Sequence, residues 1–109
     1  MKKSSLLQGT LDLLLLRILE LGPNHGWGIS QRLQQMSKDG LKTSQGSLYP
    51  ALHRLEVRGE VKSEMTPSDN NRRARMYTIT ATGRKRLNAE TETWQEFALS
   101  MRRILGERG

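Results

Sequence analysis

Cysteine is absent from this chain of 109 residues, which excludes disulfides, thiolate metal sites and a cysteine nucleophile. The only two histidines, His25 and His53, lie far apart in the sequence, and no motif pairs a nucleophile with a base. We therefore expect no enzyme activity, no cofactor and no metal site. Long hydrophobic runs are also lacking. The longest, Leu13 to Leu16, is far shorter than the ~20 residues that cross a bilayer.

The start of the chain does not predict export. Met1-Lys2-Lys3 resembles the charged start of a signal peptide, but Asp12, Arg17 and Glu20 interrupt the apolar segment that follows. We expect a cytoplasmic protein with no membrane partner. Hydrophobic residues make up only 35% of the chain, which predicts one domain with a thin core. Oligomerisation would supply the missing burial.

Positive charge is abundant and unevenly distributed. The net charge is +7, with +3 in residues 1–42, +5 in residues 43–86 and −1 in residues 87–109. Such a balance favours a polyanionic partner that binds the middle of the chain.

Two helices are predicted before this basic segment. Residues 10–21 are rich in Leu on all sides, with Thr10 as the expected N-cap and Asp12 near the positive end of the helix dipole. A helix surrounded by Leu must be covered on more than one side. The second helix is expected at about 26–36, with Trp27 as a core aromatic residue.

A third helix is predicted at about 44–58, with Leu48, Leu52 and Leu55 on its buried face. At ~100° per residue, its opposite face carries small, polar and basic groups. Pro50 lies beyond the first turn if the helix starts at Ser44. Either the helix begins nearer Gly46, or its first turn is distorted.

Strand-like alternation follows in residues 61–65 and 74–79, and turn-forming residues that end in Arg72 and Arg73 separate the two segments. This pattern predicts a long basic hairpin. Glu60, just before it, is expected to be an ordinary surface charge.

A long helix is predicted from Thr80 to near the end of the chain. Leu87, Trp94 and Met101 recur every seven residues, and other apolar residues repeat the same spacing beside them. No later segment is available to cover this seam, so we expect a second chain to do so.

The order helix, helix, turn, helix, basic hairpin is that of a winged helix-turn-helix, in a mainly α (α+β) fold. Residues 1–80 would bind DNA and residues 81–109 would form a dimerisation helix. The third helix would enter the major groove, and the wing, residues 66–75, would follow the backbone or enter the minor groove. The residues expected to contact DNA are Thr43, Ser44, Gln45, Ser47, Tyr49, Pro50, His53, Arg54, Arg72, Arg73 and Arg75. Tyr49 can equally be a core residue.

These motifs resemble the PadR family of transcriptional regulators, in its short form with a single C-terminal helix. The resemblance rests on Gly46-Ser47-Leu48-Tyr49-Pro50-Ala51-Leu52-His53-Arg54-Leu55-Glu56, on Tyr77-Thr78-Ile79-Thr80-Ala81-Thr82-Gly83, and on Gln8-Gly9 and His25-Gly26. It implies a homodimeric repressor of a pseudo-palindromic double-stranded DNA operator, in which the C-terminal helix of one subunit embraces the first helix of the other. The expected interface residues are Leu13, Leu16, Leu87, Trp94, Phe97, Ala98, Met101, Ile104 and Leu105.

The resemblance also implies a small aromatic effector, for which Trp94 is the candidate stacking residue; a plain interface anchor is the alternative. Two other functions are open to the same sequence. One is a winged-helix module that binds a protein, and the other is a ligand-sensing dimer that binds planar aromatic compounds near Trp94.

Overall fold

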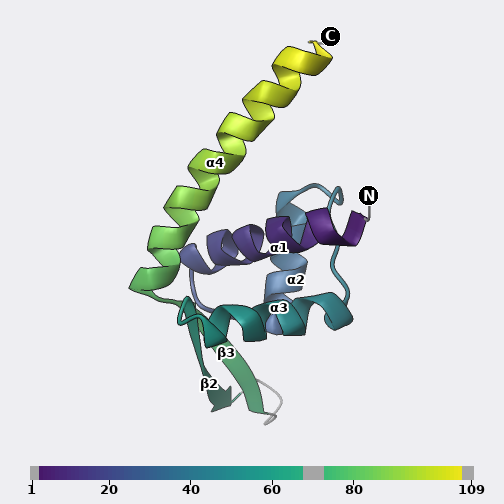
Figure 1. The fold of residues 1–109 in the computed structure, drawn as a ribbon. Helices are drawn as coiled ribbons and strands as arrows, with labels where there is room; N and C mark the ends of the chain where they lie inside the picture. The colour runs from purple at the N-terminus through teal and green to yellow at the C-terminus, as the bar shows by residue number, and fades with distance from the viewer. Residues whose placement is uncertain (1–2, 68–72, 107–109) are drawn as a thin grey trace.

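The computed structural model describes residues 3–67 and 73–106. In these ranges the elements follow one another as α1 (Lys3–Glu20), β1 (Asn24–His25), α2 (Gly26–Met36), α3 (Gln45–Val57), β2 (Val61–Pro67), β3 (Arg73–Ile79) and α4 (Ala81–Leu105). The helices α1, α2 and α3 form one body with the sheet, and α4 projects away from it (Figure 1). The radius of gyration is 15.3 Å, against ~13 Å for a compact domain of this length, because α4 extends beyond the core.

The three strands form an antiparallel sheet in the order β1-β3-β2. Val61 pairs with Ile79 and Ser63 with Tyr77, which places these four side chains on one face. Val61, Tyr77 and Ile79 are buried, so this face packs against the helices. The short strand β1, which pairs with Tyr77 and Met76, was not predicted, because two residues carry no periodic signal.

A single core joins the four helices to β2 and β3. The residues buried in it are Leu15, Leu16, Ile18, Leu19, Ile29, Leu33, Leu48, Ala51, Leu52, Leu55, Val61, Tyr77, Ile79 and Leu87. Four of them belong to α1, which confirms that this helix is covered on more than one side.

The predicted bounds of α2 and α3 are confirmed, but the predicted start of α1 is wrong. The helix begins at Lys3, so Thr10 is not its N-cap and Asp12 lies in its middle. No proline interrupts the preceding residues, and Gly9 within a helix costs only about 1 kcal/mol.

The expectation that Trp27 belongs to the core is also wrong, since its side chain is 61% exposed. The buried residues of α2 are Gly26, Ile29 and Leu33, and Trp27 lies ~100° away from Gly26 around the helix. Its ring stacks on His25, with ring centroids 6.2 Å apart. The His25 Nδ1 atom in turn accepts a hydrogen bond from the Gly28 N–H at the start of α2.

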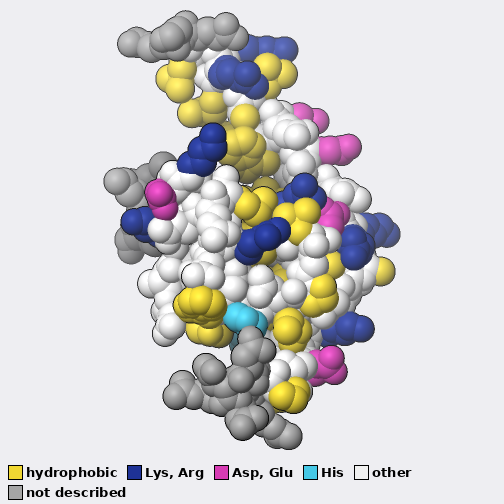
Figure 2. Space-filling model, turned by 180° about the vertical axis from the view of Figure 1, so that it is seen from behind, with side chains coloured by type: hydrophobic (Ala, Val, Ile, Leu, Met, Phe, Trp, Pro, Cys, Tyr) yellow, Lys and Arg dark blue, Asp and Glu magenta, His cyan; other side chains and the backbone are white. Residues whose placement is uncertain are grey.

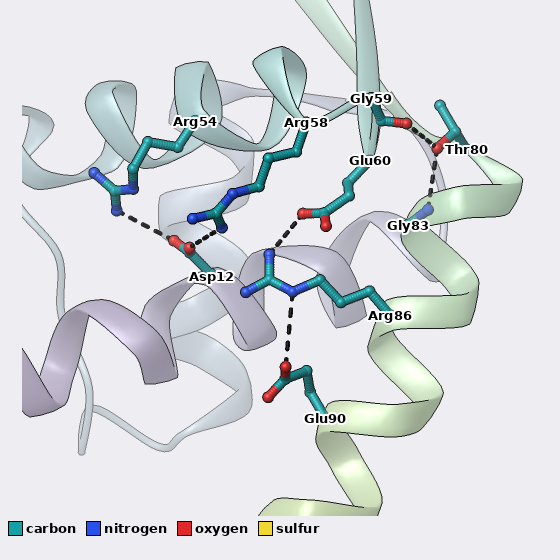
Figure 3. A network of polar contacts seen from close by, with 9 residues as sticks. All are labelled: Asp12, Arg54, Arg58, Gly59, Glu60, Thr80, Gly83, Arg86 and Glu90. Atoms are coloured by element: carbon teal, nitrogen blue, oxygen red, sulfur yellow. Dashed lines mark hydrogen bonds and ion pairs between the residues drawn. The ribbon is translucent and has the colours of Figure 1, made fainter.

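The junction between the sheet and α4 is closely packed. Thr80 is the N-cap, as predicted: its hydroxyl accepts from the Gly83 N–H at 3.1 Å and donates to the Gly59 carbonyl at 2.6 Å (Figure 3). The Thr80 N–H also donates to the Glu60 carbonyl. Four backbone groups thus set the direction in which α4 leaves the sheet.

Candidate nucleic-acid interface

The first turn of α3 is held by its own side chains. Ser44 is the N-cap, and its hydroxyl accepts from the Ser47 N–H at 3.2 Å and donates to the Ser47 hydroxyl at 3.3 Å. The Thr43 hydroxyl donates to the Ser44 carbonyl. The helix therefore begins at Gln45, and Pro50 lies inside it on the exposed side.

One face of α3 is exposed, and most of its side chains are small or polar. Leu48, Ala51, Leu52 and Leu55 are buried, whereas the predicted contact residues Ser44, Gln45, Ser47, Pro50 and His53 are exposed, together with Gly46. Helix N-terminal N–H groups and hydroxyls can bind phosphate, and small side chains allow the backbone a close approach.

Tyr49 occupies an intermediate position, which is why the sequence favoured neither role. Tyr49 is 43% exposed, yet its ring lies against Gly26 at the start of α2. A Cβ atom at Gly26 would lie 2.6 Å from the Tyr49 hydroxyl oxygen, so glycine is needed there for this contact. Tyr49 thus ties α3 to α2 while its edge remains accessible.

Arg54 differs most from the prediction, because its guanidinium turns toward α1. Its Nη2 atom lies 3.2 Å from Asp12 Oδ1, and Arg58 Nη1 lies 3.5 Å from Asp12 Oδ2 (Figure 3). Asp12 is only 5% exposed. The carboxylate that was expected to face a helix dipole instead joins α1 to α3 through two arginines.

This ion-pair cluster should contribute measurably to stability. We expect Asp12→Asn to lower the free energy of unfolding by about 1–3 kcal/mol, because a buried carboxylate with two cationic partners is lost. Urea denaturation measures the change. Glu20→Gln, which removes the exposed pair with Arg17, is the control and should cost under ~0.5 kcal/mol. Equal effects would show that burial of Asp12 adds nothing.

Another ion pair joins the residue just before β2 to α4. Glu60 is 7% exposed, and its Oε1 atom lies 2.6 Å from Arg86 Nη1, so the expectation of an ordinary surface charge is wrong (Figure 3). The Arg86 Nε atom also lies 3.9 Å from Glu90 Oε1. Nothing in the local sequence indicates this pair, whose members are 26 residues apart.

The described part of the wing, in β2 and β3, extends away from α4, next to α3 (Figure 1). Of its predicted contact residues, Arg75 is exposed on β3, Arg73 begins that strand, and Arg72 lies outside the described residues. Arg75 Nη1 donates to the Ser63 hydroxyl at 3.0 Å, and that hydroxyl donates to Glu56 Oε2 at 2.7 Å.

Tyr77 lies at the base of the same cluster. Burial raises the pKa of its hydroxyl above the ordinary value of 10.0, while the nearby Arg75 guanidinium lowers it; Glu56 and Tyr49 add to the rise. Tyr77 is therefore neutral over the physiological range.

The predicted interface residues fall into three groups by exposure. Leu16 and Leu87 are 0% and 3% exposed within one chain, so their side chains have no surface to offer a partner, and both belong to the core. Leu13 is partly buried, and Ala98 has intermediate exposure. The remaining five are exposed on α4: Trp94, Phe97, Met101, Ile104 and Leu105.

This exposed row continues a stripe that begins inside the protein. Leu87 packs on the core, and one heptad later Trp94 is 48% exposed because α4 has left the domain. Ile104, farther along, is 80% exposed. Figure 2 shows hydrophobic side chains gathered on the projecting helix.

Residues 3–67 and 73–106 lack two other kinds of feature. No helix in these ranges is long and apolar enough to span a membrane. The same residues contain no cluster of three or more His, Asp or Glu side chains that could hold a metal ion.

The order of elements, the wing and the exposed face of α3 agree with a match to a known family. The model of the transcriptional regulator PadR-like family matches residues 15–89, from α1 into α4. The chain belongs to this family. It is a PadR-like transcriptional regulator and not an enzyme.

Three similar proteins show how far the likeness extends. The transcriptional regulator Rv3488 of Mycobacterium tuberculosis is 40% identical over 73 residues, which are 67% of this chain but only 64% of that protein. The crystal structure of a PadR family regulator from Clostridium difficile R20291 is 27% identical, with a TM-score of 0.75, and the match covers 87% of this chain and 97% of that one. A transcriptional regulator from Clostridium thermocellum shares the fold, with a TM-score of 0.85 at 24% identity over 94% of this chain and 99% of the other.

Proposed function

We propose that this PadR-like regulator is a homodimeric repressor that binds a pseudo-palindromic operator in double-stranded DNA. The observation that carries the proposal is the free face of α3, where exposed small and polar residues lie beside a basic wing. Residues 1–80 bind DNA in this proposal, and residues 81–109 form the dimerisation helix. Gln45 and Ser47 contact base edges, and Arg73 and Arg75 contact the backbone.

The dimer is supported by the uncovered half of α4. Its exposed apolar row needs a partner surface, and an apolar groove of about 190 Å³ lies between α1 and α2, lined in part by Leu14, Ile18, Leu33, Met36 and Leu41. In the proposed dimer, α4 of a second copy of the chain covers α1 beside this groove. The two copies of α3 would then read half-sites about 34 Å apart.

The experiment begins with selection of binding duplexes, about 30 bp long, from a random pool. Fluorescence anisotropy then compares the selected duplex with a scrambled one across a salt series. We expect two half-sites about one helical turn apart and one dimer bound per duplex. The affinity for the selected duplex should exceed that for the scrambled duplex by about a thousandfold. Equal binding to both duplexes would contradict a specific regulator. No binding at low salt would favour the protein-binding module instead.

The close approach of α3 to DNA gives a prediction in which stability and affinity move in opposite directions. Gly46 is exposed in the helix, and a Cβ there would lie 3.7 Å from Ser44 Oγ, which is ordinary van der Waals contact. Gly46→Ala should therefore raise the free energy of unfolding by about 0.5–1 kcal/mol. It should also weaken operator binding, because the methyl group stands between the helix and the groove. Tighter binding by this variant would show that α3 does not approach DNA through Gly46.

The small aromatic effector stays a prediction. Trp94 is half exposed in the single chain, so a flat compound that stacks on it would quench tryptophan fluorescence, and a Trp27→Phe background would isolate the signal.

A further inference from the structure

The side chain of Arg75 is oriented by a two-step relay that joins three elements. The Arg75 guanidinium, on β3, donates to the Ser63 hydroxyl on β2, which donates its single proton to the Glu56 carboxylate on α3. Because that proton is given to Glu56, the lone pairs of Ser63 Oγ are left to accept from Arg75. Glu56 thus fixes which way the serine hydroxyl points.

The strand register places this relay on the inner side of the wing. Ser63 lies opposite Tyr77, and Met65 lies opposite Arg75, so these side chains share the face that packs against the helices. Tyr77 is buried on that face, whereas Arg75, two residues farther out, is exposed. The guanidinium therefore lies where the wing extends past α3, in the angle between the two.

The relay orients the Arg75 side chain but uses only some of the N–H donors of its guanidinium. A guanidinium has five N–H donors, and among the described residues one hydrogen bond, to Ser63, is seen for Arg75. Within the same part of the chain no carboxylate forms an ion pair with Arg75 within 4.0 Å, in contrast to Arg54, Arg58 and Arg86. Among the described residues, its charge and most of its donors are therefore not taken up by another group.

We propose that Ser63 and Glu56 are positioning residues that hold the Arg75 guanidinium ready for a DNA phosphate in the angle between α3 and the wing. The proposal rests on the DNA-binding function proposed above. A free arginine side chain loses rotamer freedom when it binds, and a side chain already held by Ser63 loses less. Glu56 contributes by orienting Ser63, although its own charge repels phosphate.

The test measures how the affinity for the selected duplex depends on salt in variants of Arg75, Ser63, Lys62 and Glu56. Arg75→Ala should reduce the steepness of the slope of log K against log salt by about 1.8, because each subunit of the dimer loses one phosphate contact worth about 0.9. Ser63→Ala should weaken binding about 2- to 10-fold, and it should reduce the steepness of the salt slope by less than Arg75→Ala does. Ser63→Thr, which keeps the hydroxyl, should bind like the wild type. The double variant with both alanines should bind no more weakly than Arg75→Ala alone.

Lys62→Ala provides a matched control. Lys62 is an exposed cation on the neighbouring residue of β2, but its side chain is on the opposite face of the sheet. It should change the slope less than Arg75→Ala. Equal salt slopes for Lys62→Ala and Arg75→Ala would overturn the proposal, because any cation on the wing would then contact phosphate as well as Arg75 does.

Two substitutions of Glu56 should change the affinity for DNA in different directions. Glu56→Gln keeps an oxygen acceptor for Ser63 and removes the negative charge, so binding should be as tight as in the wild type or tighter. Glu56→Ala removes the acceptor and should weaken binding as Ser63→Ala does. Tighter binding by Glu56→Ala, or an unchanged salt slope in Ser63→Ala, would overturn the positioning role. Thermal unfolding of each variant separates these effects from loss of fold, and failure of the wild type to bind any duplex would instead refute DNA binding itself.

Discussion

Replacing Gly83 with alanine should lower the free energy of unfolding by about 3 kcal/mol. Gly83 is buried at the start of α4, and a Cβ atom there would overlap the Glu60 carbonyl oxygen and lie 2.8 Å from Ile79 Cγ1. The carbonyl cannot move aside, because it accepts from the Thr80 N–H. The added methyl group must displace α4 or break the Thr80 cap, and either change loosens the junction with the sheet.

Urea denaturation at a fixed protein concentration measures this loss, since the stability of a dimer depends on concentration. The matched control is Gly9→Ala. Gly9 is an exposed residue of α1, and apart from its chain neighbours and the backbone of its own helix no described atom lies within 4 Å of a Cβ there, so alanine should raise stability by up to about 1 kcal/mol. A stable Gly83→Ala protein would mean that α4 does not leave the sheet through this close contact.

Trp94→Glu should convert the proposed dimer into monomers and weaken operator binding by at least about 100-fold. Trp94 is the first large residue of the apolar stripe that is no longer covered by its own domain. A carboxylate at that position would be buried without a partner in the interface, at a cost of several kcal/mol. Binding to two half-sites is then lost, and with it the gain from linking two recognition helices.

Sedimentation equilibrium measures the mass of the Trp94→Glu protein in solution, and fluorescence anisotropy measures its affinity for the selected duplex. Gln95→Glu adds the same charge at an exposed position ~100° away around α4, outside the apolar stripe, and should remain dimeric. A Trp94→Glu protein that sediments as a dimer would refute the interface on α4. Binding by a stable monomer with unchanged affinity would refute the proposed pairing of half-sites.

The local pattern of the sequence was sufficient for most of the fold. The ends of α2 and α3, the Thr80 cap and the strands β2 and β3 follow from apolar spacing, capping residues and turn-forming residues, all of which act within a few positions along the chain. The same spacing on α4 predicted a stripe that its own domain does not cover. The basic middle segment and the outward face of α3 also came from the sequence.

Only the tertiary structure decided which charged and aromatic residues are buried, paired or free. Asp12 meets Arg54 and Arg58 across 42 and 46 residues, and Glu60 meets Arg86 across 26, so no local pattern contains these pairs. Trp27 became exposed because the packing of α2 selects the face of Gly26, and Leu16 and Leu87 became core residues because α1 and α4 meet inside one chain. Ser63 and Glu56 gained a role only when the register of β2 and β3 brought them to Arg75. Periodicity determines which face of an element is apolar, but the partner of each side chain depends on how the elements pack.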